Sequence, residues 1–129
     1  MRLLRKLRSR RVIVSNADAS WHNLAEFLGS ADIVYQGPYS ERALIAPEYR
    51  ILLEFVEAFR LEAESYLLQG LRSSNAMVVA YSLLGLKVVG SEHLCGAAES
   101  IRRHDRVRWR LGLTEGTRSL HEFAGLLGR

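Results

Sequence analysis

The longest run of regularly spaced apolar residues in the chain extends from Pro47 to Gly70. Apolar side chains recur there every three or four positions, which is the spacing of one face of an α-helix. Pro47 suits the first helical turn because it has no N–H group to leave unbonded, and Gly70 is a suitable stop. The pattern predicts one amphipathic helix over 47–69, and its wide apolar face predicts contacts with two neighbours.

A second helix is predicted over 76–89, where apolar residues occupy almost every position. The preceding residues 73–75 are Ser-Ser-Asn, which are all N-cap candidates, and Gly90 can end the helix. Gly85 inside this helix costs about 1 kcal/mol relative to alanine, so its presence predicts close packing against a neighbour. Because only a short loop separates the two helices, we expect them to form a central antiparallel hairpin.

Shorter helical patterns lie on either side of this hairpin. Ser20 can cap a short helix before it, and Ser91 can cap a helix over 92–103 after it. Near the C-terminus, Ser119 and Glu122 have the spacing of a capping box and precede a further apolar run. We therefore expect three shorter helices around the hairpin.

Three short segments have the residue types or the alternation of β-strands. Residues 12–14 form a β-branched run that favours a strand, and residues 33–35 favour extended pairing. Residues 106–111 alternate arginine with apolar side chains, a period of two that fits a short strand or the turn after a helix. The predicted fold class is therefore mainly α: a small helical bundle around the hairpin, with short strand pairing near the N-terminus.

The composition is that of one folded domain. The chain has 129 residues, of which 48% are hydrophobic and 25% are charged, enough to bury a core without disulfides or metal ions. Its single cysteine, Cys95, cannot form an intramolecular disulfide, which favours a reducing, cytoplasmic location. No apolar run approaches the roughly 18–20 residues of a membrane-spanning helix.

The charges divide the chain into an acidic middle and two basic ends. Residues 1–11 contain six basic and no acidic side chains, residues 12–101 contain five basic and eleven acidic ones, and residues 102–129 contain seven basic and three acidic ones. We therefore distinguish a basic N-terminal segment, 1–11, from a single helical domain, 12–129. The segment has leucines at helical spacing and fits a frayed terminus, a targeting presequence, a membrane-surface helix or a nucleic-acid-binding arm.

No catalytic or metal-binding pattern is found among the reactive side chains. His22 and Glu26 would share a helix face, but the sequence offers no third metal ligand at a recognisable spacing. Cys95 and the glutamates lack the neighbouring residues that mark a nucleophile or an acid–base pair. The chain is therefore predicted not to be an enzyme and to need no cofactor or metal.

The basic residues that follow residue 101 form the predicted binding site. Arginine and tryptophan are favoured at the energetic centre of protein interfaces, and arginine beside an aromatic ring also suits phosphate contacts with base stacking. An acidic protein partner, a nucleic acid, and a structural role with the tryptophan in the core are all compatible with the cluster. The predicted partner-binding residues are Arg102, Arg103, Arg106, Arg108, Trp109 and Arg110, and a second surface on the long helix comprises Glu54, Glu57 and Glu64.

The second helix begins Ser74-Asn75-Ala76-Met77-Val78-Val79-Ala80-Tyr81-Ser82-Leu83-Leu84, a polar cap followed by β-branched residues, alanine and leucine. In this, the hairpin resembles one unit of a HEAT-like α-solenoid, over about a third of the chain. The Ala-Tyr-x-Leu pattern, with the later Trp-x-x-Gly and Leu-x-x-Phe-Ala segments, is similar to small bacterial helical proteins of unassigned role. Some of these act beside polymorphic toxins as immunity or accessory proteins, which implies binding to another protein.

The function predicted from the sequence is a non-catalytic module that binds another protein, in the manner of an immunity, inhibitor or adaptor protein. It would act by occlusion or scaffolding, with charge complementarity to an acidic partner surface. The alternative is nucleic-acid binding through the basic N-terminus and the segment Arg102–Arg110. Salt titration distinguishes the two, because phosphate contacts lose affinity steeply with rising salt on any DNA or RNA.

Overall fold

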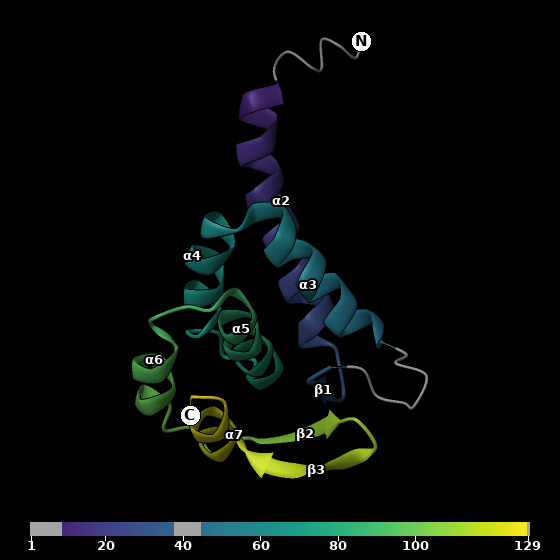
Figure 1. The fold of residues 1–129 in the computed structure, drawn as a ribbon, viewed down its shortest axis with the longest axis vertical. Helices are drawn as coiled ribbons and strands as arrows, with labels where there is room; N and C mark the ends of the chain where they lie inside the picture. Colours follow the sequence, from purple (N-terminus) through teal and green to yellow (C-terminus); the bar gives the residue numbers. More distant parts are fainter. Residues whose placement is uncertain (1–8, 38–44, 129) are drawn as a thin grey trace.

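The fold places a group of helices on a small three-stranded sheet (Figure 1). The computed structural model describes residues 9–37 and 45–128, with side chains from residue 16 onward. Most of the described residues are helical, which confirms the predicted mainly α class. In chain order the elements are α2 (Ser9–Gly29), β1 (Val34–Tyr35), α3 (Pro47–Phe59), α4 (Leu61–Gly70), α5 (Ala76–Val89), α6 (Leu94–Ser100), β2 (Arg106–Leu111), β3 (Thr114–Ser119) and α7 (Leu120–Leu127).

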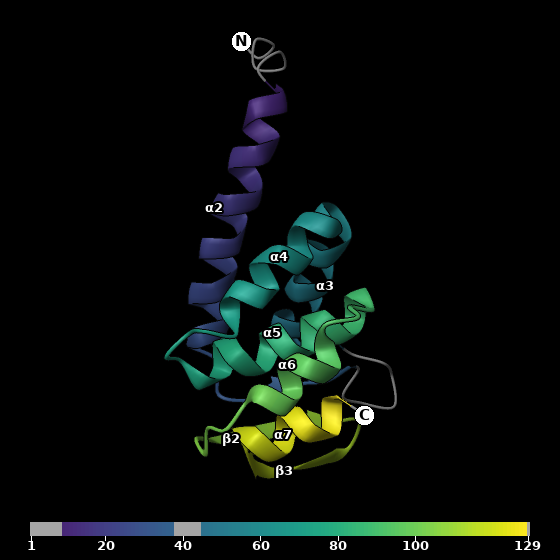
Figure 2. The ribbon, with the colours of Figure 1, turned by 90° about the vertical axis from the view of Figure 1, so that its left-hand side faces the viewer.

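The central helix is α5, which is buried along most of its length. Its N-cap is Asn75, whose side-chain oxygen accepts the Met77 N–H at 2.9 Å, and it ends at Gly90 in the left-handed region, with φ 72°. Both caps and the burial agree with the sequence prediction. Helix α4 pairs with α5 after a short turn, and α2, α3, α6 and α7 also contact α5 (Figure 2).

The predicted single helix over 47–69 is wrong in one respect, because the chain turns at Arg60 and forms the two helices α3 and α4. Arg60 has φ 47° and ψ −110°, a conformation that residues with a side chain rarely adopt. The turn lets α3 lie against α2 and β1 while α4 packs along α5. Tertiary packing therefore overrides a continuous local pattern, and Leu61 at the corner is left exposed.

Two glycines allow other helices to approach closely. A Cβ atom on Gly85 would lie 2.7 Å from a methyl carbon of Leu67, which confirms the close packing predicted for this glycine. A Cβ atom on Gly70 would overlap the Ser82 hydroxyl and lie 2.9 Å from the Trp21 ring. Helix α4 ends at Gly70 as predicted, but Gly70 keeps negative φ, so glycine is required there by this contact and not by a left-handed turn.

Helix α2 corrects two predictions for the N-terminal part of the chain. A single helix runs from Ser9 to Gly29, so residues 12–14 are not a strand and Ser20 is not an N-cap. Trp21, on the predicted apolar face, is buried against the other helices. Extending an existing helix toward its N-terminus needs no new nucleation. This advantage outweighs the preference of the β-branched residues 12–14 for a strand. Residues 1–8 of the predicted basic segment lie outside the described residues.

The sheet has the order β1–β2–β3, with β1 parallel to β2 and β2 antiparallel to β3. The extended pairing predicted for residues 33–35 is present as β1, and residues 106–111 form a strand, which decides between the two predicted alternatives. The residues of β3 lack the alternation of apolar and polar side chains that predicts a strand, because all six are polar or glycine.

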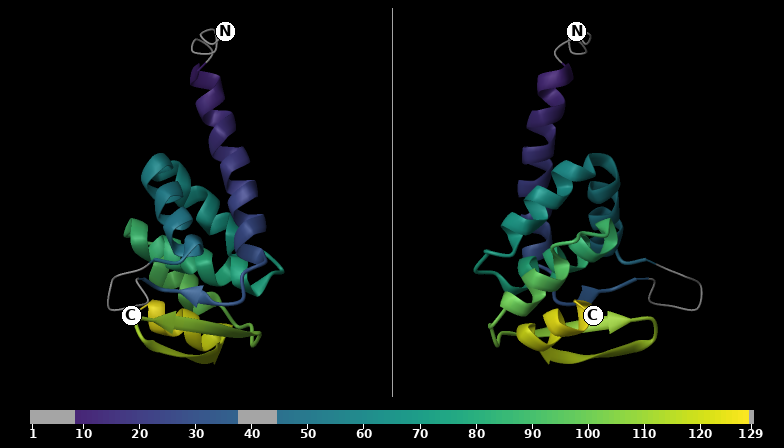
Figure 3. Two further views of the ribbon diagram at one scale, coloured as in Figure 1. Left: turned by 90° about the vertical axis from the view of Figure 1, so that its right-hand side faces the viewer. Right: turned by 60° about the vertical axis from the view of Figure 1, so that its left-hand side comes forward.

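Helix α7 begins with the predicted capping box and lies beside the sheet (Figure 3). The Ser119 hydroxyl accepts the Glu122 N–H, and the Glu122 carboxylate accepts the Ser119 N–H, both at 3.1 Å. Helix α6 is shorter than the predicted 92–103, because the following segment leaves the helix to reach α7. There the Asp105 carbonyl accepts the Leu120 N–H at 2.7 Å.

Candidate interaction surface

Strand β2 sends apolar and basic side chains to opposite faces of the sheet. Val107 is buried in the core on the inner face, toward the helices. Because side chains alternate along a strand, Arg106, Arg108 and Arg110 lie on the outer face. Arg106 and Arg108 are exposed and Arg110 is partly buried. We call these three residues the arginine face.

Trp109 belongs to the inner face of the sheet and not to the arginine face. Its ring lies over Gly116 of β3, where a Cβ atom would come within 3.0 Å of the ring. The Arg118 guanidinium stacks on the same ring, 4.2 Å from its centroid, as a cation–π contact. Trp109 is partly buried in this arrangement, so it holds the two strands together and is poorly placed for the predicted contact with a partner.

Arg103 is engaged in contacts within the protein. Its guanidinium donates hydrogen bonds to the carbonyl groups of Ser73 and Ser74, at 2.6 and 2.8 Å, in the turn between α4 and α5. It also donates to the Asp105 carboxylate at 3.0 Å, and this bond lowers the pKa of Asp105 below its ordinary value. Arg103 therefore ties the segment before β2 to the helical hairpin, whereas the neighbouring Arg102 is exposed.

The outer face of β2 and β3 carries more positive than negative charge. The Arg110 Nε donates to the Gly112 carbonyl at 3.2 Å, which keeps that arginine near the hairpin turn. Arg108 Nη2 lies 3.8 Å from the Glu115 carboxylate, and both side chains are exposed, so this ion pair is weak. Glu115 is the single acidic residue of these two strands, against three arginines on the same face.

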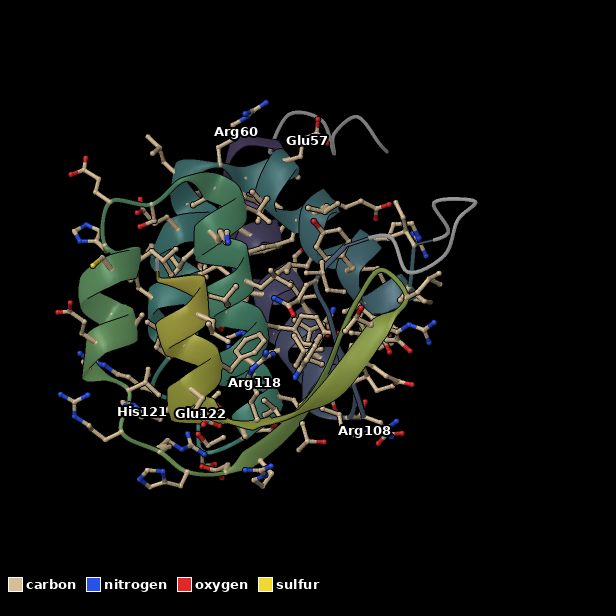
Figure 4. All side chains as sticks on the ribbon, turned by 60° about the horizontal axis from the view of Figure 1, so that its bottom comes forward. Glu57, Arg60, Arg108, Arg118, His121 and Glu122 are labelled. Carbon is tan, nitrogen blue, oxygen red and sulfur yellow. The ribbon has the colours of Figure 1, made fainter. Side chains whose placement is uncertain are left out.

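The predicted second surface is divided between two helices. Glu54 and Glu57 are exposed on α3, whereas Glu64 lies on α4 and accepts a hydrogen bond from the Ser91 hydroxyl. Glu64 thus fixes the turn after α5 and is only partly accessible. In Figure 4, Glu57 lies well apart from Arg108, so this part of the acidic surface does not adjoin the arginine face.

Among the described residues, Cys95, Glu99 and His121 line one shared pocket between α6 and α7, and they form no metal-binding group. The part of the chain that the structure describes holds no group of three or more His, Cys, Asp or Glu side chains able to bind a metal ion. His22 Nδ1 lies 2.9 Å from the Asp18 carbonyl, and the exposed Cys95 lies 3.8 Å from the Glu99 carboxylate. Within residues 9–37 and 45–128, every helix is too short or too polar to cross a lipid bilayer.

The sequence patterns do not reveal the residues of β3 that adjoin the arginine face. Glu115 and Thr117 are exposed there, and Arg118 covers Trp109 from the inner face. One signal points to this strand: Gly112 and the following residue separate the alternating segment from β3, and a two-residue connection with glycine is typical of a β-hairpin. Gly112 has φ 61°, as such a turn requires.

No protein-family model, curated protein or solved structure matches this chain. The resemblances to a HEAT-like hairpin and to small immunity proteins therefore remain predictions. A functional proposal depends on the geometry and charge of the described residues.

Proposed function

We propose that the protein is a non-catalytic module of the immunity, inhibitor or adaptor type, which binds an acidic surface of another protein through its arginine face. The observation that carries this proposal is the exposure of Arg106 and Arg108 on the face of β2 opposite the core. Val107, between them, is buried, and β2 has a paired strand on each side. A strand held in this way presents both guanidinium groups with little backbone entropy to lose on binding.

The chemistry of these groups suits carboxylates. Arginine can donate two parallel hydrogen bonds to one carboxylate, and a surplus of positive charge steers an acidic partner and sets its register. Binding would act by occlusion or scaffolding, in the cytoplasm. Arg103 would have a structural role and hold the start of β2 in place, because its guanidinium is already bonded to the α4–α5 turn.

Nucleic-acid binding is the alternative, and it would use the same guanidinium groups. The start of α2 lies at the opposite end of the molecule from β2 and β3 (Figures 1 and 2). A short nucleic acid bound at the arginine face would therefore not reach the first described turn of α2. This separation favours the protein partner over a site that combines both basic segments.

The test compares two double charge reversals. Arg106→Glu with Arg108→Glu alters the arginine face, and Arg72→Glu with Lys87→Glu makes the same change in net charge at exposed positions outside the sheet. Partners are cross-linked in the cells that produce the protein and identified by mass spectrometry, and thermal unfolding verifies that both variants fold. We expect the wild type and the control double variant to capture an acidic partner, and the arginine-face double variant to lose it.

A second arm addresses the alternative by gel shift with random DNA and RNA at low salt. Neutralised phosphates would give an affinity that falls steeply with the logarithm of the salt concentration. Nucleic-acid binding with this steep salt dependence, without a captured protein partner, would contradict the proposal. Retention of every partner by the arginine-face double variant would contradict it as well.

A further inference from the structure

Within the described residues, the two edges of the sheet differ in whether their backbone groups have partners. On β1, the Tyr81 hydroxyl accepts the Tyr35 N–H at 3.0 Å and donates to the Ile33 carbonyl at 2.7 Å. Backbone groups alternate in direction along a strand, and β1 bonds to β2 through the residues that alternate with Ile33 and Tyr35. The groups of Ile33 and Tyr35 therefore point away from β2. The side chain of a buried tyrosine therefore takes the place of a further strand and closes this edge.

The register shows which groups of β3 point outward. The Gln36 N–H donates to the Arg110 carbonyl, so the backbone of Arg110 faces β1. Arg110 is paired with Glu115, and groups alternate in direction along an antiparallel ladder. The N–H and C=O groups of Glu115 and Thr117 therefore point away from β2, whereas those of Gly116 bond to Trp109.

No described segment pairs with this side of β3, which is the last strand in the order β1–β2–β3. Glu115 and Thr117 are exposed, and β3 lies at one end of the molecule in Figures 1 and 3, beside α7 and away from α2, α3 and α4. Proteins often block such an edge with proline, lysine or a bulge. Thr114–Ser119 contains neither proline nor lysine, and its pairing with β2 is regular over all six residues. Its inward-pointing charge, Arg118, is stacked on Trp109 of the neighbouring strand β2 and so leans away from the open edge.

We propose that an extended acidic segment of the partner adds to β3 as a fourth strand, bonded to the backbone of Glu115 and Thr117; this inference rests on the proposed function. Side chains of the added strand would alternate between the two faces. Those on the outer face would pass beside Thr117, whose partner across the ladder is Arg108. Because Thr117 is small, a carboxylate there comes within reach of the Arg108 guanidinium.

The charge distribution favours an acidic peptide over a second copy of this chain. Pairing of two copies through β3 would join two arginine faces into one continuous surface of like charge. On the outer face, carboxylates of an acidic strand would replace Glu115 in its weak, exposed ion pair with Arg108, and on the inner face they would meet Arg118, which is stacked on Trp109. Strand addition supplies affinity through the backbone, and the arginines supply the preference for acidic sequence.

The experiment uses a synthetic peptide of alternating valine and glutamate, with alternating valine and lysine as the control peptide. Amide hydrogen exchange of the full-length protein is followed by NMR at neutral pH. We expect the acidic peptide to protect the amides of Glu115 and Thr117, with little change at Trp109, whose backbone is already bonded within the sheet. The lysine peptide should protect neither amide.

Two substitutions of the same residue sharpen the test. Thr117→Pro removes an outward N–H, which an edge strand tolerates, and Thr117→Val keeps the backbone donor. We expect Thr117→Pro to weaken binding of the acidic peptide about tenfold or more and Thr117→Val to leave it nearly unchanged. The amide protection in the wild type decides the matter even if the proline variant does not fold.

The outcomes separate this inference from the proposed function. If the acidic peptide binds and depends on Arg106 and Arg108 but leaves the amides of Glu115 and Thr117 unprotected, strand addition is wrong while the arginine face stands. If the peptide does not bind at all, strand addition is also wrong, and the cross-linking experiment judges the arginine face independently. Self-association that Thr117→Pro abolishes would show that a second copy occupies the edge, which overturns the proposal of an acidic partner strand.

Discussion

The Tyr81 hydroxyl donates a hydrogen bond of 2.7 Å to the Ile33 carbonyl and so joins the central helix to the first strand. The same oxygen accepts the Tyr35 N–H, so one side chain satisfies both a donor and an acceptor of β1. Burial raises the pKa of Tyr81 above its ordinary value, which keeps the hydroxyl protonated and able to donate. This contact is one of those that hold the sheet against the helices.

Removing the Tyr81 hydroxyl should destabilise the protein strongly, although only one oxygen atom is lost. We expect Tyr81→Phe to lower the free energy of unfolding by about 1–3 kcal/mol, because it leaves a backbone N–H and a carbonyl without their partner. Urea denaturation measures the change. Tyr49→Phe, which removes the hydroxyl of a partly buried tyrosine on α3, is the control and should cost clearly less. Equal stability of the two variants would contradict the structural role of Tyr81.

Two glycine substitutions should have effects of opposite sign. Gly125 lies exposed inside α7 with open space around it, so Gly125→Ala should stabilise the protein by about 1 kcal/mol through helix propensity. Gly70→Ala would press a methyl group onto Ser82 and the rigid Trp21 ring and should destabilise by about 1–3 kcal/mol. Thermal unfolding of both variants measures the difference. A stabilising Gly70→Ala would show that α4 does not approach α2 and α5 so closely.

The adjacent residues Arg102 and Arg103 should differ sharply when each is replaced by alanine. Arg103→Ala removes charge-assisted hydrogen bonds to the α4–α5 turn and should cost about 1–2 kcal/mol, a value reduced for partial exposure of the side chain. Arg102→Ala alters an exposed side chain and should change stability by less than about 0.5 kcal/mol. Chemical denaturation compares them. Similar losses from both would indicate that the tether to the turn contributes little.

The capping box of α7 should make stability depend on pH in the acidic range. A hydrogen bond from the Ser119 N–H lowers the pKa of Glu122 below its ordinary value. The ionised carboxylate therefore stabilises the fold at pH values above the unfolded-state pKa of about 4.3, and this contribution is lost as the pH falls through the lower folded-state value. Glu122→Gln keeps an acceptor without the charge. We expect the wild type to be more stable than this variant at neutral pH and the difference to vanish in acid, as measured by denaturation across that range.

Local spacing was sufficient to predict the elements whose ends are set by their own residues. The N-cap at Asn75, the stop at Gly90 and the box formed by Ser119 and Glu122 all involve groups within a few positions of one another. The inward and outward alternation of 106–111 likewise follows from the period of a strand. This period allows a strand with its arginines on one face, and the structure shows Arg106 and Arg108 exposed there.

The remaining features depend on contacts between distant parts of the chain. The turn at Arg60 lets α3 reach β1 while α4 packs along α5, and Gly70 is needed because Trp21 and Ser82 come near it. The sequence assigns equal binding roles to Arg103 and Arg108, but only Arg103 finds two carbonyl groups to bond, some thirty positions earlier in the chain.

The sequence by itself determined the helical class, the central buried helix and the basic character of the C-terminal third, since these follow from periodicity, caps and composition. The tertiary structure decided which arginines are exposed, that β3 pairs with β2, and that Tyr81 closes one sheet edge while no described segment covers the other. The physical reason is that hydrogen bonds and close packing between distant segments depend on their relative placement, which local residue patterns do not specify.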